Sequence, residues 1–236
     1  MEQDKEIKQP QEEGKQQEAQ AVETQQDVKK EEARKKKKAS SPLRLQTKDF
    51  ISVGIFSLIY AAVAFVVGAL MQMTPFTFPF MPPVVAIFTG TVFMLYVAKT
   101  PKRWALTIMG AIGAILLFVT GMFWMMSVFF LVFGFIADLI CASGKFRSFR
   151  RNMIGYCVMA LAPMGAYVPM ALMPAQFDAF MKTKGNAESF AEVIRMIGGN
   201  WWPVPLMALV TIICALIGGF IGKLLLKKHF EKAGIV

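Results

Sequence analysis

Long uncharged apolar runs constrain this chain more than any other feature of its sequence. The first extends from Phe50 to Met71. At a rise of 1.5 Å per residue, a helix of this length matches a hydrocarbon core roughly 30 Å thick. Similar runs recur along the chain, where 55% of all residues are hydrophobic and only 18% are charged. An ordinary soluble domain is less apolar and more charged, so these values predict an integral membrane protein.

The apolar runs predict an all-α, polytopic membrane protein built as a bundle of six transmembrane helices. The expected spans cover residues 50–71, 84–98, 104–120, 124–142, 152–173 and 201–222. Together they form one membrane domain, residues 47–236. Pro163 and Pro169 lie inside the fifth span, so its second half is expected to be kinked or partly unwound.

A different composition marks residues 1–46, which are rich in Gln, Glu and Lys. Residues 1–48 hold 12 of the 26 Lys/Arg and 10 of the 16 Asp/Glu, with no aromatic residue before Phe50. Such a segment lacks the apolar side chains that a folded core needs. It is expected to be a disordered or loosely helical cytoplasmic tail.

Basic residues outside the tail gather in short loops beside the apolar runs. After the first span, the segments expected on the inner side contain 11 Lys/Arg and those expected on the outer side contain 3. Since Lys and Arg are enriched in cytoplasmic loops, both termini are expected in the cytoplasm and the protein in a cell membrane. This clustering beside apolar runs also argues against a nucleic-acid partner, which would need a continuous basic face.

Asp138 is the only carboxylate inside an apolar run. An ionisable residue in a span is a functional-site hypothesis by default. However, Asp138 lies five residues before Ser143, close to the expected cytoplasmic end of its helix. A structural or docking role, with the carboxylate paired to Lys145 or to a loop arginine, is therefore favoured over a role in ligand binding.

Two segments on the outer side are unusual. Residues 72–83 contain four prolines and no charge, which predicts an irregular lid or plug over a cavity; a merely proline-stiffened connector is the alternative. Residues 175–199 form the one long outer connection. Their apolar residues follow helical spacing and predict a short amphipathic helix that lies on the membrane or on the bundle, with Phe190, Val193, Ile194 and Ile197 on one face.

The outer ends of the helices offer the candidate ligand-binding residues. These are aromatic or neutral hydrogen-bonding side chains, and an uncharged or aromatic-ring ligand is the hypothesis that follows from them. The alternative for the tryptophans is a role as membrane-interface anchors, and Asn200 is also a candidate cap for the last helix. The candidates are Gln72, Thr74, Trp124, Ser127, Tyr167, Asn200, Trp201 and Trp202.

Neither a metal site nor a catalytic set is expected. The three cysteines, Cys141, Cys157 and Cys214, lack the short spacings of a metal site, and they are interpreted as small apolar residues of the bundle. The spans contain no combination of nucleophile, histidine and carboxylate. No cofactor is implied, and an enzyme is disfavoured.

Several segments of the chain resemble the Trep_Strep (MptD-like) family of substrate-binding S components of energy-coupling factor (ECF) transporters. The resemblance covers about residues 45–236 and is most specific at the end of the chain. It is carried by Lys48–Phe50, Gly54–Phe56, Ala137–Ile140, Gly144–Ser148, Asn152, Tyr156 and Gly222–Ile235.

This resemblance implies a bacterial six-helix S component of an ECF-type ABC importer. Such a subunit captures a small micronutrient under its first outer loop, docks on a transmembrane T component and is thought to topple in the bilayer. Two partner ATPases hydrolyse ATP, consistent with the lack of a phosphate-binding loop motif in this chain. Docking commonly uses small residues of the first helix, which here are Ser57, Ala61, Ala64 and Gly68.

Two other classes remain open at this point. A free-standing carrier would usually show inverted repeats and charges buried near the membrane midplane, and neither is visible in the sequence. A membrane scaffold or assembly protein could use the same small-residue faces for close helix packing. It would not account for the proline-rich outer loop.

Overall fold

The protein is described by a computed structural model over residues 45, 47–74, 76–184, 187–198 and 200–230. The tail expected over residues 1–46 lies, apart from Leu45, outside these residues. The described part of the chain is helical throughout, with nine α-helices, three shorter helical turns and no strand. The predicted all-α class is confirmed.

The described helices all lie in the membrane domain, residues 47–236. The α-helices are α3 (Thr47–Met71), α4 (Met81–Lys99), α5 (Ala105–Val119), α6 (Trp124–Ser143), α7 (Phe149–Ala160), α8 (Val168–Leu172), α9 (Pro174–Thr183), α10 (Ala187–Ile197) and α11 (Pro203–Leu225). The short turns are η1 (Phe78–Phe80) and η2 (Ala162–Ala166), both 3-10 helical, and η3 (Leu226–Phe230), a π-helical turn.

Four segments are long and apolar enough to cross a membrane. They are Asp49–Met71, Phe78–Lys99, Trp124–Ser143 and Pro203–Lys228. The third expected span is the shorter apolar helix α5, whose 15 residues give a length of about 22 Å. The fifth expected span is not one helix. The structure therefore supports four of the six expected spans by length and composition.

Prolines break the fifth span into three pieces. α7 ends at Ala160, Pro163 lies in the 3-10 turn η2, and Pro169 lies in the first turn of α8. Proline has no N–H to donate and its ring clashes with the preceding turn, so a regular helix cannot run through both positions. The expectation that the second half of this span is unwound is confirmed.

The proline-rich loop between the first two expected spans is more helical than expected. η1 begins at Phe78, and α4 begins at Met81 and takes Pro82 and Pro83 into its first turn. Proline is tolerated there because the first N–H groups of a helix have no intrahelical partner. The expected irregular segment, residues 72–83, is thus reduced to the residues between α3 and η1.

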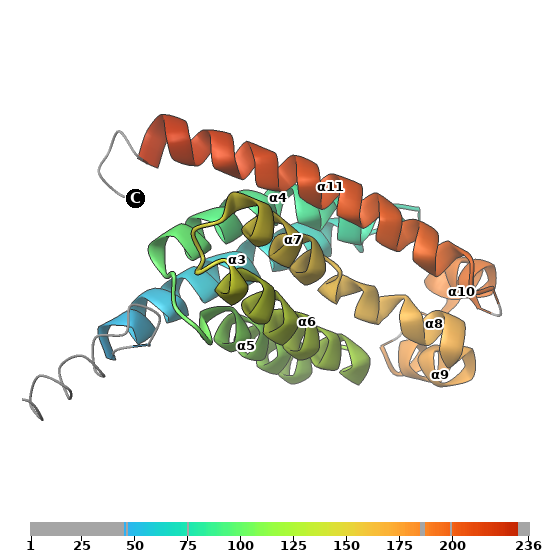
Figure 1. Ribbon diagram of the computed structural model, residues 1–236. Helices are drawn as coiled ribbons and strands as arrows, with labels where there is room; N and C mark the ends of the chain where they lie inside the picture. The colour runs from blue at the N-terminus through green and yellow to red at the C-terminus, as the bar shows by residue number, and fades with distance from the viewer. Residues whose placement is uncertain (1–44, 46, 75, 185–186, 199, 231–236) are drawn as a thin grey trace, which may run out of the picture. The chain divides into compact units, whose positions relative to one another are not determined.

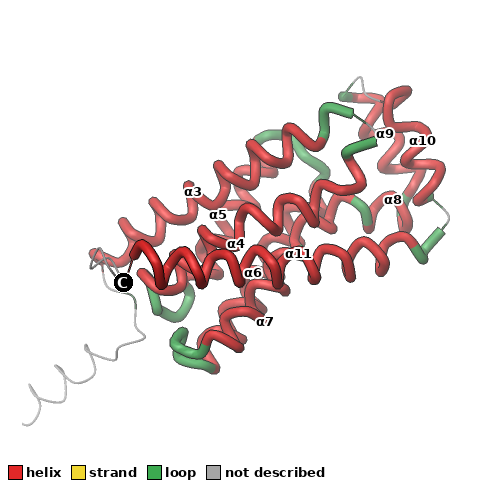
Figure 2. Tube along the Cα trace, turned by 90° about the horizontal axis from the view of Figure 1, so that it is seen from above, coloured by secondary structure: helices red, strands yellow, loops and turns green. Residues whose placement is uncertain are grey.

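The long helices pack around α4 and α6. α11 lies along α4, which also contacts α3, while α5 packs on α6 and α7 lies against α6, α4 and α11. In Figure 1, α11 runs along one side of this bundle, with α5 and α6 on the other. The short helices α8, α9 and α10 gather at the end of the bundle away from the last turn of α11, as Figure 2 also shows. The expected amphipathic helix corresponds to α10, whose Val193, Ile194 and Ile197 are buried in the bundle, while the side chain of Phe190 lies outside the described residues.

α4 and α11 approach each other so closely that only glycine fits between them. A Cβ atom on Gly90 would lie 2.3 Å from the backbone carbon of Gly218, and one on Gly218 would lie 2.5 Å from the carbonyl oxygen of Ala86. Gly222 is similarly close to the backbone of Gly90. Small residues allow this close approach and strengthen the dispersion contact between helices in a bilayer. Gly218 and Gly222 thus form a small-residue face on α11.

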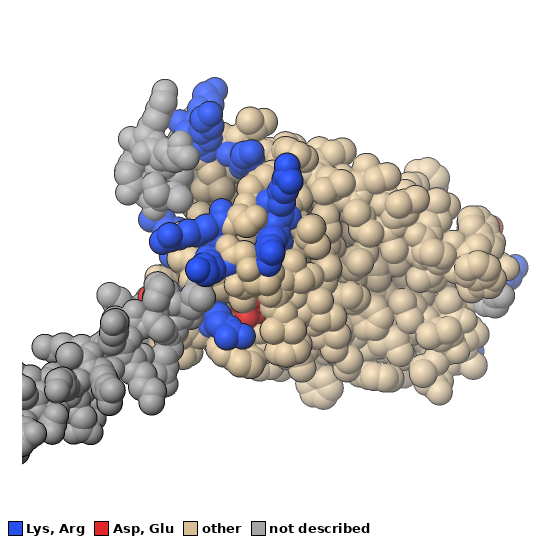
Figure 3. Space-filling view, in the orientation of Figure 1, with Lys and Arg blue, Asp and Glu red and all other residues tan. Residues whose placement is uncertain are grey.

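Basic side chains gather at one end of the bundle (Figure 3). This basic end is formed by the α4–α5 connection, the α6–α7 connection with the start of α7, and the end of α11. The opposite end, which carries α8, α9 and α10, has Lys182, Lys184 and Arg195. The residues of the basic end are Lys99, Lys102, Arg103, Lys145, Arg147, Arg150, Arg151, Lys223, Lys227 and Lys228.

The α4–α11 contact can be tested with two alanine substitutions. Alanine favours a helix over glycine by about 0.5–1 kcal/mol, so Gly54→Ala, where nothing lies within 4 Å of the new Cβ, is expected to preserve or raise stability. Gly90→Ala is expected to lower it by about 1–3 kcal/mol, because the methyl group would meet the backbone of Gly218. Thermal melting of both variants in detergent measures the difference. Equal melting temperatures would contradict the close contact.

Candidate functional site

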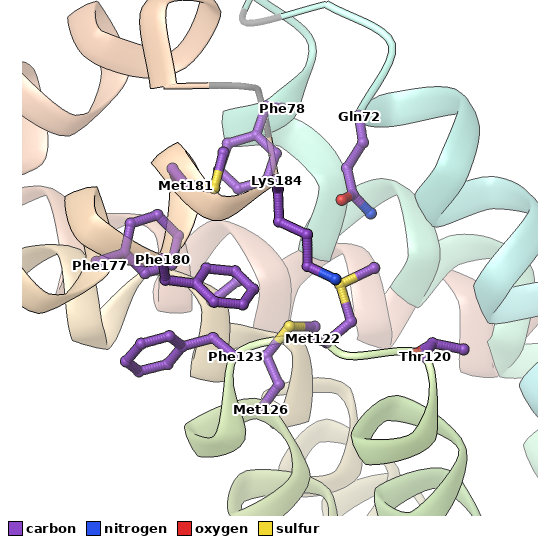
Figure 4. Close-up of a pocket in the computed structure, with 11 residues that line it drawn as sticks. Gln72, Phe78, Thr120, Met122, Phe123, Met126, Phe177, Phe180, Met181 and Lys184 are labelled. Atoms are coloured by element: carbon purple, nitrogen blue, oxygen red, sulfur yellow. The ribbon is translucent and has the colours of Figure 1, made fainter.

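A cavity of about 220 Å³ lies at the end of the bundle opposite the basic end. Its lining comes from the end of α3, from η1, from the turn between α5 and α6 with the start of α6, from η2 and from α9 (Figure 4). The lining residues are Gln72, Phe78, Thr120, Met122, Phe123, Met126, Ala166, Phe177, Phe180, Met181 and Lys184. At about 30 Å³ per water molecule, this volume corresponds to about seven waters and suits a small ligand.

The broken fifth span holds one side of this cavity in place. Tyr167, between η2 and α8, is fully buried, and its hydroxyl donates a hydrogen bond to the backbone carbonyl of Phe78. The two rings lie with their centroids 5.1 Å apart. This hydrogen bond joins η1 to the residue between η2 and α8. The loop before α4 and the fifth expected span therefore build the cavity together.

Aromatic contacts fix α9 over the turn between α5 and α6. The ring centroid of Phe123 lies 5.4 Å from that of Phe177 and 5.4 Å from that of Phe180. Such pairs add about 0.5–1.5 kcal/mol each beyond the apolar area they bury. The surrounding core is rich in methionine, including Met126, Met164 and Met170. Flexible thioether side chains allow a cavity wall to adapt to its contents.

Three lining residues carry polar groups. The amide nitrogen of Gln72 donates to the carbonyl of Gly68 at 3.3 Å and approaches the sulfur of Met81 at 3.7 Å. The hydroxyl of Thr120 donates to the carbonyl of Leu117 at 3.0 Å. Both side chains retain oxygen lone pairs that can accept a hydrogen bond. Lys184 supplies the third polar group and the only charge in the lining.

A second, larger opening of about 680 Å³ lies between α3, α4, α5 and α6. It shares Gln72, Thr120, Met122 and Met126 with the cavity, so the two are neighbours. Its lining is almost entirely apolar and includes side chains such as Phe65, which is more than half exposed on the outer face of α3. A lateral apolar groove of this kind faces acyl chains in a bilayer. The smaller cavity, with its polar groups, is the better ligand site.

The structure brings one of the eight expected ligand residues to the cavity. Gln72 lines it, and Tyr167 supports it from behind without lining it. Ser127 is half-buried, and its hydroxyl oxygen is buried with no hydrogen-bond partner, yet it does not line the cavity. Trp124 is half exposed and stands beside Phe123, which does line the cavity.

The remaining expected ligand residues lie on the surface. Trp201 and Trp202 are 77% and 58% exposed, which fits interface anchors rather than ligand contacts. Thr74 is exposed and shares a hydrogen bond of 2.8 Å with Thr77. Asn200 does not cap α11: its amide donates to the carbonyl of Met196 at 3.1 Å at the end of α10, and Trp202 occupies the cap position.

Sequence reasoning missed most of the lining. Met122 and Phe123 follow the uncharged turn after α5, so the same argument from outer helix ends could have selected them. Phe177, Phe180 and Lys184 could not be selected, because nothing in the sequence indicates that α9 folds back over that turn. The cavity lining therefore includes one charged residue, Lys184, whereas all the expected ligand residues are uncharged.

The small-residue stripe of α3 faces the chain's own bundle. Ser57 is 1% exposed, and Gly68 is buried with Met81 packed against it. Ala61 and Ala64 are half-buried beside the lateral groove. Of the expected docking residues, Ser57 is thus buried in the bundle, while Ala61, Ala64 and Gly68 line the open lateral groove.

Asp138 holds the start of α5. The residue is 3% exposed, and its carboxylate accepts hydrogen bonds from the backbone N–H groups of Trp104 at 3.0 Å and Leu106 at 3.1 Å. Trp104 has a left-handed φ of 72°, which is unfavourable for a residue with a side chain. The carboxylate compensates for this strain by satisfying N–H groups that a helix start leaves without partners.

The expected ion pair between Asp138 and Lys145 is not formed. Lys145 is exposed, and it lies with Phe146 in a left-handed turn after α6. Asn152 secures this turn by donating a hydrogen bond of 2.9 Å to the carbonyl of Phe146. The favoured structural role of Asp138 fits its contacts, but its partners are backbone amides rather than a cation.

Replacing Asp138 and Lys145 one at a time distinguishes these two arrangements. Asp138→Asn puts an NH₂ group where one backbone N–H needs an acceptor, so it is expected to lower the free energy of unfolding by about 1–3 kcal/mol. Lys145→Gln is expected to change it by less than about 0.5 kcal/mol, since the side chain is exposed. Melting curves in detergent measure both. An equal loss of stability in the two variants would instead support an ion pair between Asp138 and Lys145.

Comparison with known proteins assigns the chain to one family. Residues 47–232 match the family model described as a hypothetical bacterial integral membrane protein, Trep_Strep. Neither the curated proteins nor the solved structures contain a match to the chain. The match covers the whole described bundle. The chain therefore belongs to the Trep_Strep family of bacterial integral membrane proteins.

Proposed function

We propose that the protein is the substrate-binding S component of an ECF-type ABC importer. In this role it captures a small micronutrient at the outer face of the bacterial cell membrane. It then docks on a transmembrane T component that is driven by two ATPase subunits. The chain itself is not an enzyme in this proposal, because the partner subunits hydrolyse ATP.

One observation carries the proposal: a cavity lies at the end of the bundle opposite the basic end. Lys and Arg are enriched on the cytoplasmic side of membrane proteins, so the basic end is assigned to the cytoplasm and the cavity to the outside. Both termini of the membrane domain then face the cytoplasm. A binding site that faces outward suits capture of a solute before transport.

The construction of the cavity supports binding rather than scaffolding. Five separate segments converge on it, and one of them is the unwound middle of the fifth span. Irregular backbone at membrane depth is tolerated where it lines a cavity, and it is unnecessary in a simple packing helix. A scaffold would need neither the break nor the hydrogen bond between Tyr167 and Phe78.

Co-purification from native membranes tests the importer. The full chain carrying an affinity tag is expected to bring down a T component and two ATPases in mild detergent, and to release a small molecule on denaturation. Met122→Trp, which fills the cavity, is expected to retain the protein partners and lose the small molecule. Met196→Trp, at an exposed position of α10, should retain both. Mass spectrometry identifies all components, and absence of both ATPases and ligand would favour a scaffold.

Accessibility of single cysteines tests the orientation. In a chain with its three native cysteines replaced, Arg147→Cys places a thiol at the basic end and Asn200→Cys places one at the cavity end. A membrane-impermeant thiol reagent added to intact cells is expected to label the residue 200 thiol and to reach the residue 147 thiol only after lysis. The reverse pattern would place the cavity on the cytoplasmic side.

A further inference from the structure

Lys184 is placed as a recognition group for the cavity. It follows the last turn of α9, and its side chain extends into the cavity toward the turn that carries Met122 (Figure 4). Its ammonium nitrogen lies 5.8 Å from the ring centroid of Phe180, on the edge of cation–π range. The residue as a whole is exposed, so the ammonium stands at the mouth of the cavity and still reaches water.

Among the side chains that the structure describes, no carboxylate pairs with this cation; the side chain of Glu188 lies outside them. The cavity lining contains no Asp or Glu. Asp178, on the same helix, is already paired with Lys182 at 2.8 Å. The other described ion pair, between Lys102 and Asp49, lies at the opposite end of the bundle. The ammonium is therefore available to form a charge-assisted hydrogen bond with an anion in the cavity.

A glycine in the turn between α5 and α6 lies beside the ammonium. Gly121 has a left-handed φ of 68°, and a Cβ atom built on it would lie 2.8 Å from the Lys184 nitrogen. Any other residue would therefore be strained at this position and would displace the ammonium. The turn between α5 and α6 and the end of α9 thus fit each other at the point where the charge lies.

The remaining polar groups of the lining accept rather than donate. The amide nitrogen of Gln72 and the hydroxyl proton of Thr120 are used within the protein, which leaves their oxygen atoms as acceptors. Between these groups and Lys184 lie the flat or flexible apolar side chains of Phe123, Met122 and Met126. The cavity therefore combines one positive charge, hydrogen-bond acceptors and apolar walls.

We propose that the cavity binds a small monocarboxylate with a flat apolar body. Its carboxylate lies on the ammonium of Lys184, and its body lies between Phe123, Phe180 and the methionines. One cation balances one negative charge, and the volume of about 220 Å³ limits the body to about the size of a single ring. This assigns a substrate class to the proposed import site and so rests on that proposal for its biological role. It replaces the uncharged ligand expected from the sequence.

Three probes of the same shape and different charge test the preference. Benzoate, benzamide and benzamidine are planar single rings that are anionic, neutral and cationic at neutral pH. Saturation-transfer NMR on the full chain in detergent at low salt measures their affinities. Benzoate is expected to bind at least about tenfold more tightly than benzamide, as charge-assisted hydrogen bonds allow, and benzamidine more weakly than either.

Variants assign the preference to Lys184. Lys184→Gln is expected to reduce the affinity for benzoate to that for benzamide, with the benzamide affinity and melting temperature unchanged. Gly121→Ala acts from the opposite wall and should also weaken benzoate selectively. Arg195→Gln removes one exposed positive charge from the same end of the bundle and should change neither affinity by more than about twofold, because Arg195 does not line the cavity.

The proposal fails if no probe binds, if benzamide binds as tightly as benzoate, or if Lys184→Gln and Arg195→Gln weaken benzoate equally. The last result would indicate general attraction rather than a site. These outcomes are separate from those of the co-purification experiment, because the purified chain needs no partner to show a charge preference. A clear preference for benzoate, with no ATPases in the co-purification, would support the anion site and contradict the proposed importer.

Discussion

The structure depends on how the fifth expected span is packed where its regular helix is interrupted. Pro163 and Pro169 remove two N–H donors and prevent a regular helix from continuing beyond α7. In a membrane protein the freed backbone groups must find partners inside the protein. The 3-10 turn η2 packs so closely on α6 that a Cβ atom on Gly165 would lie 2.7 Å from the Cα atom of Met126. The break thereby becomes one wall of the cavity rather than a defect.

Buried tyrosines and an aspartate hold the neighbouring backbone. Tyr167 donates to the carbonyl of Phe78, and Tyr156 donates to the carbonyl of Ala86 and shares a hydrogen bond of 3.0 Å with Thr89. At the basic end, Asp138 accepts from two N–H groups at the start of α5. In each case a side chain from one helix satisfies the backbone of another. These bonds join α4, α5, α6 and the broken span at both ends, while glycine contacts join α4 to α11 between them.

This division of the bundle into a rigid part and an adaptable part fits the proposed function. The rigid part contains close backbone contacts such as that between Gly90 and Gly218. The cavity end contains short helices, methionines and aromatic rings, which can rearrange at small cost. Lys184 lies at this adaptable end, where α9 already contacts the turn after α5.

The sequence by itself determined the membrane class, the long helices and the break in the fifth span. Apolar run length and proline chemistry act locally, so they can be read from neighbouring residues. The same holds for the buried face of α10, which follows helical spacing. Only the tertiary structure decided what Asp138 and Lys184 contact. Asp138 reaches the backbone of Trp104 and Leu106, and Lys184 reaches a cavity formed by helices distant in the sequence. Such contacts depend on how α9 folds over the α5–α6 turn and how α5 begins beside α6, which no local pattern encodes.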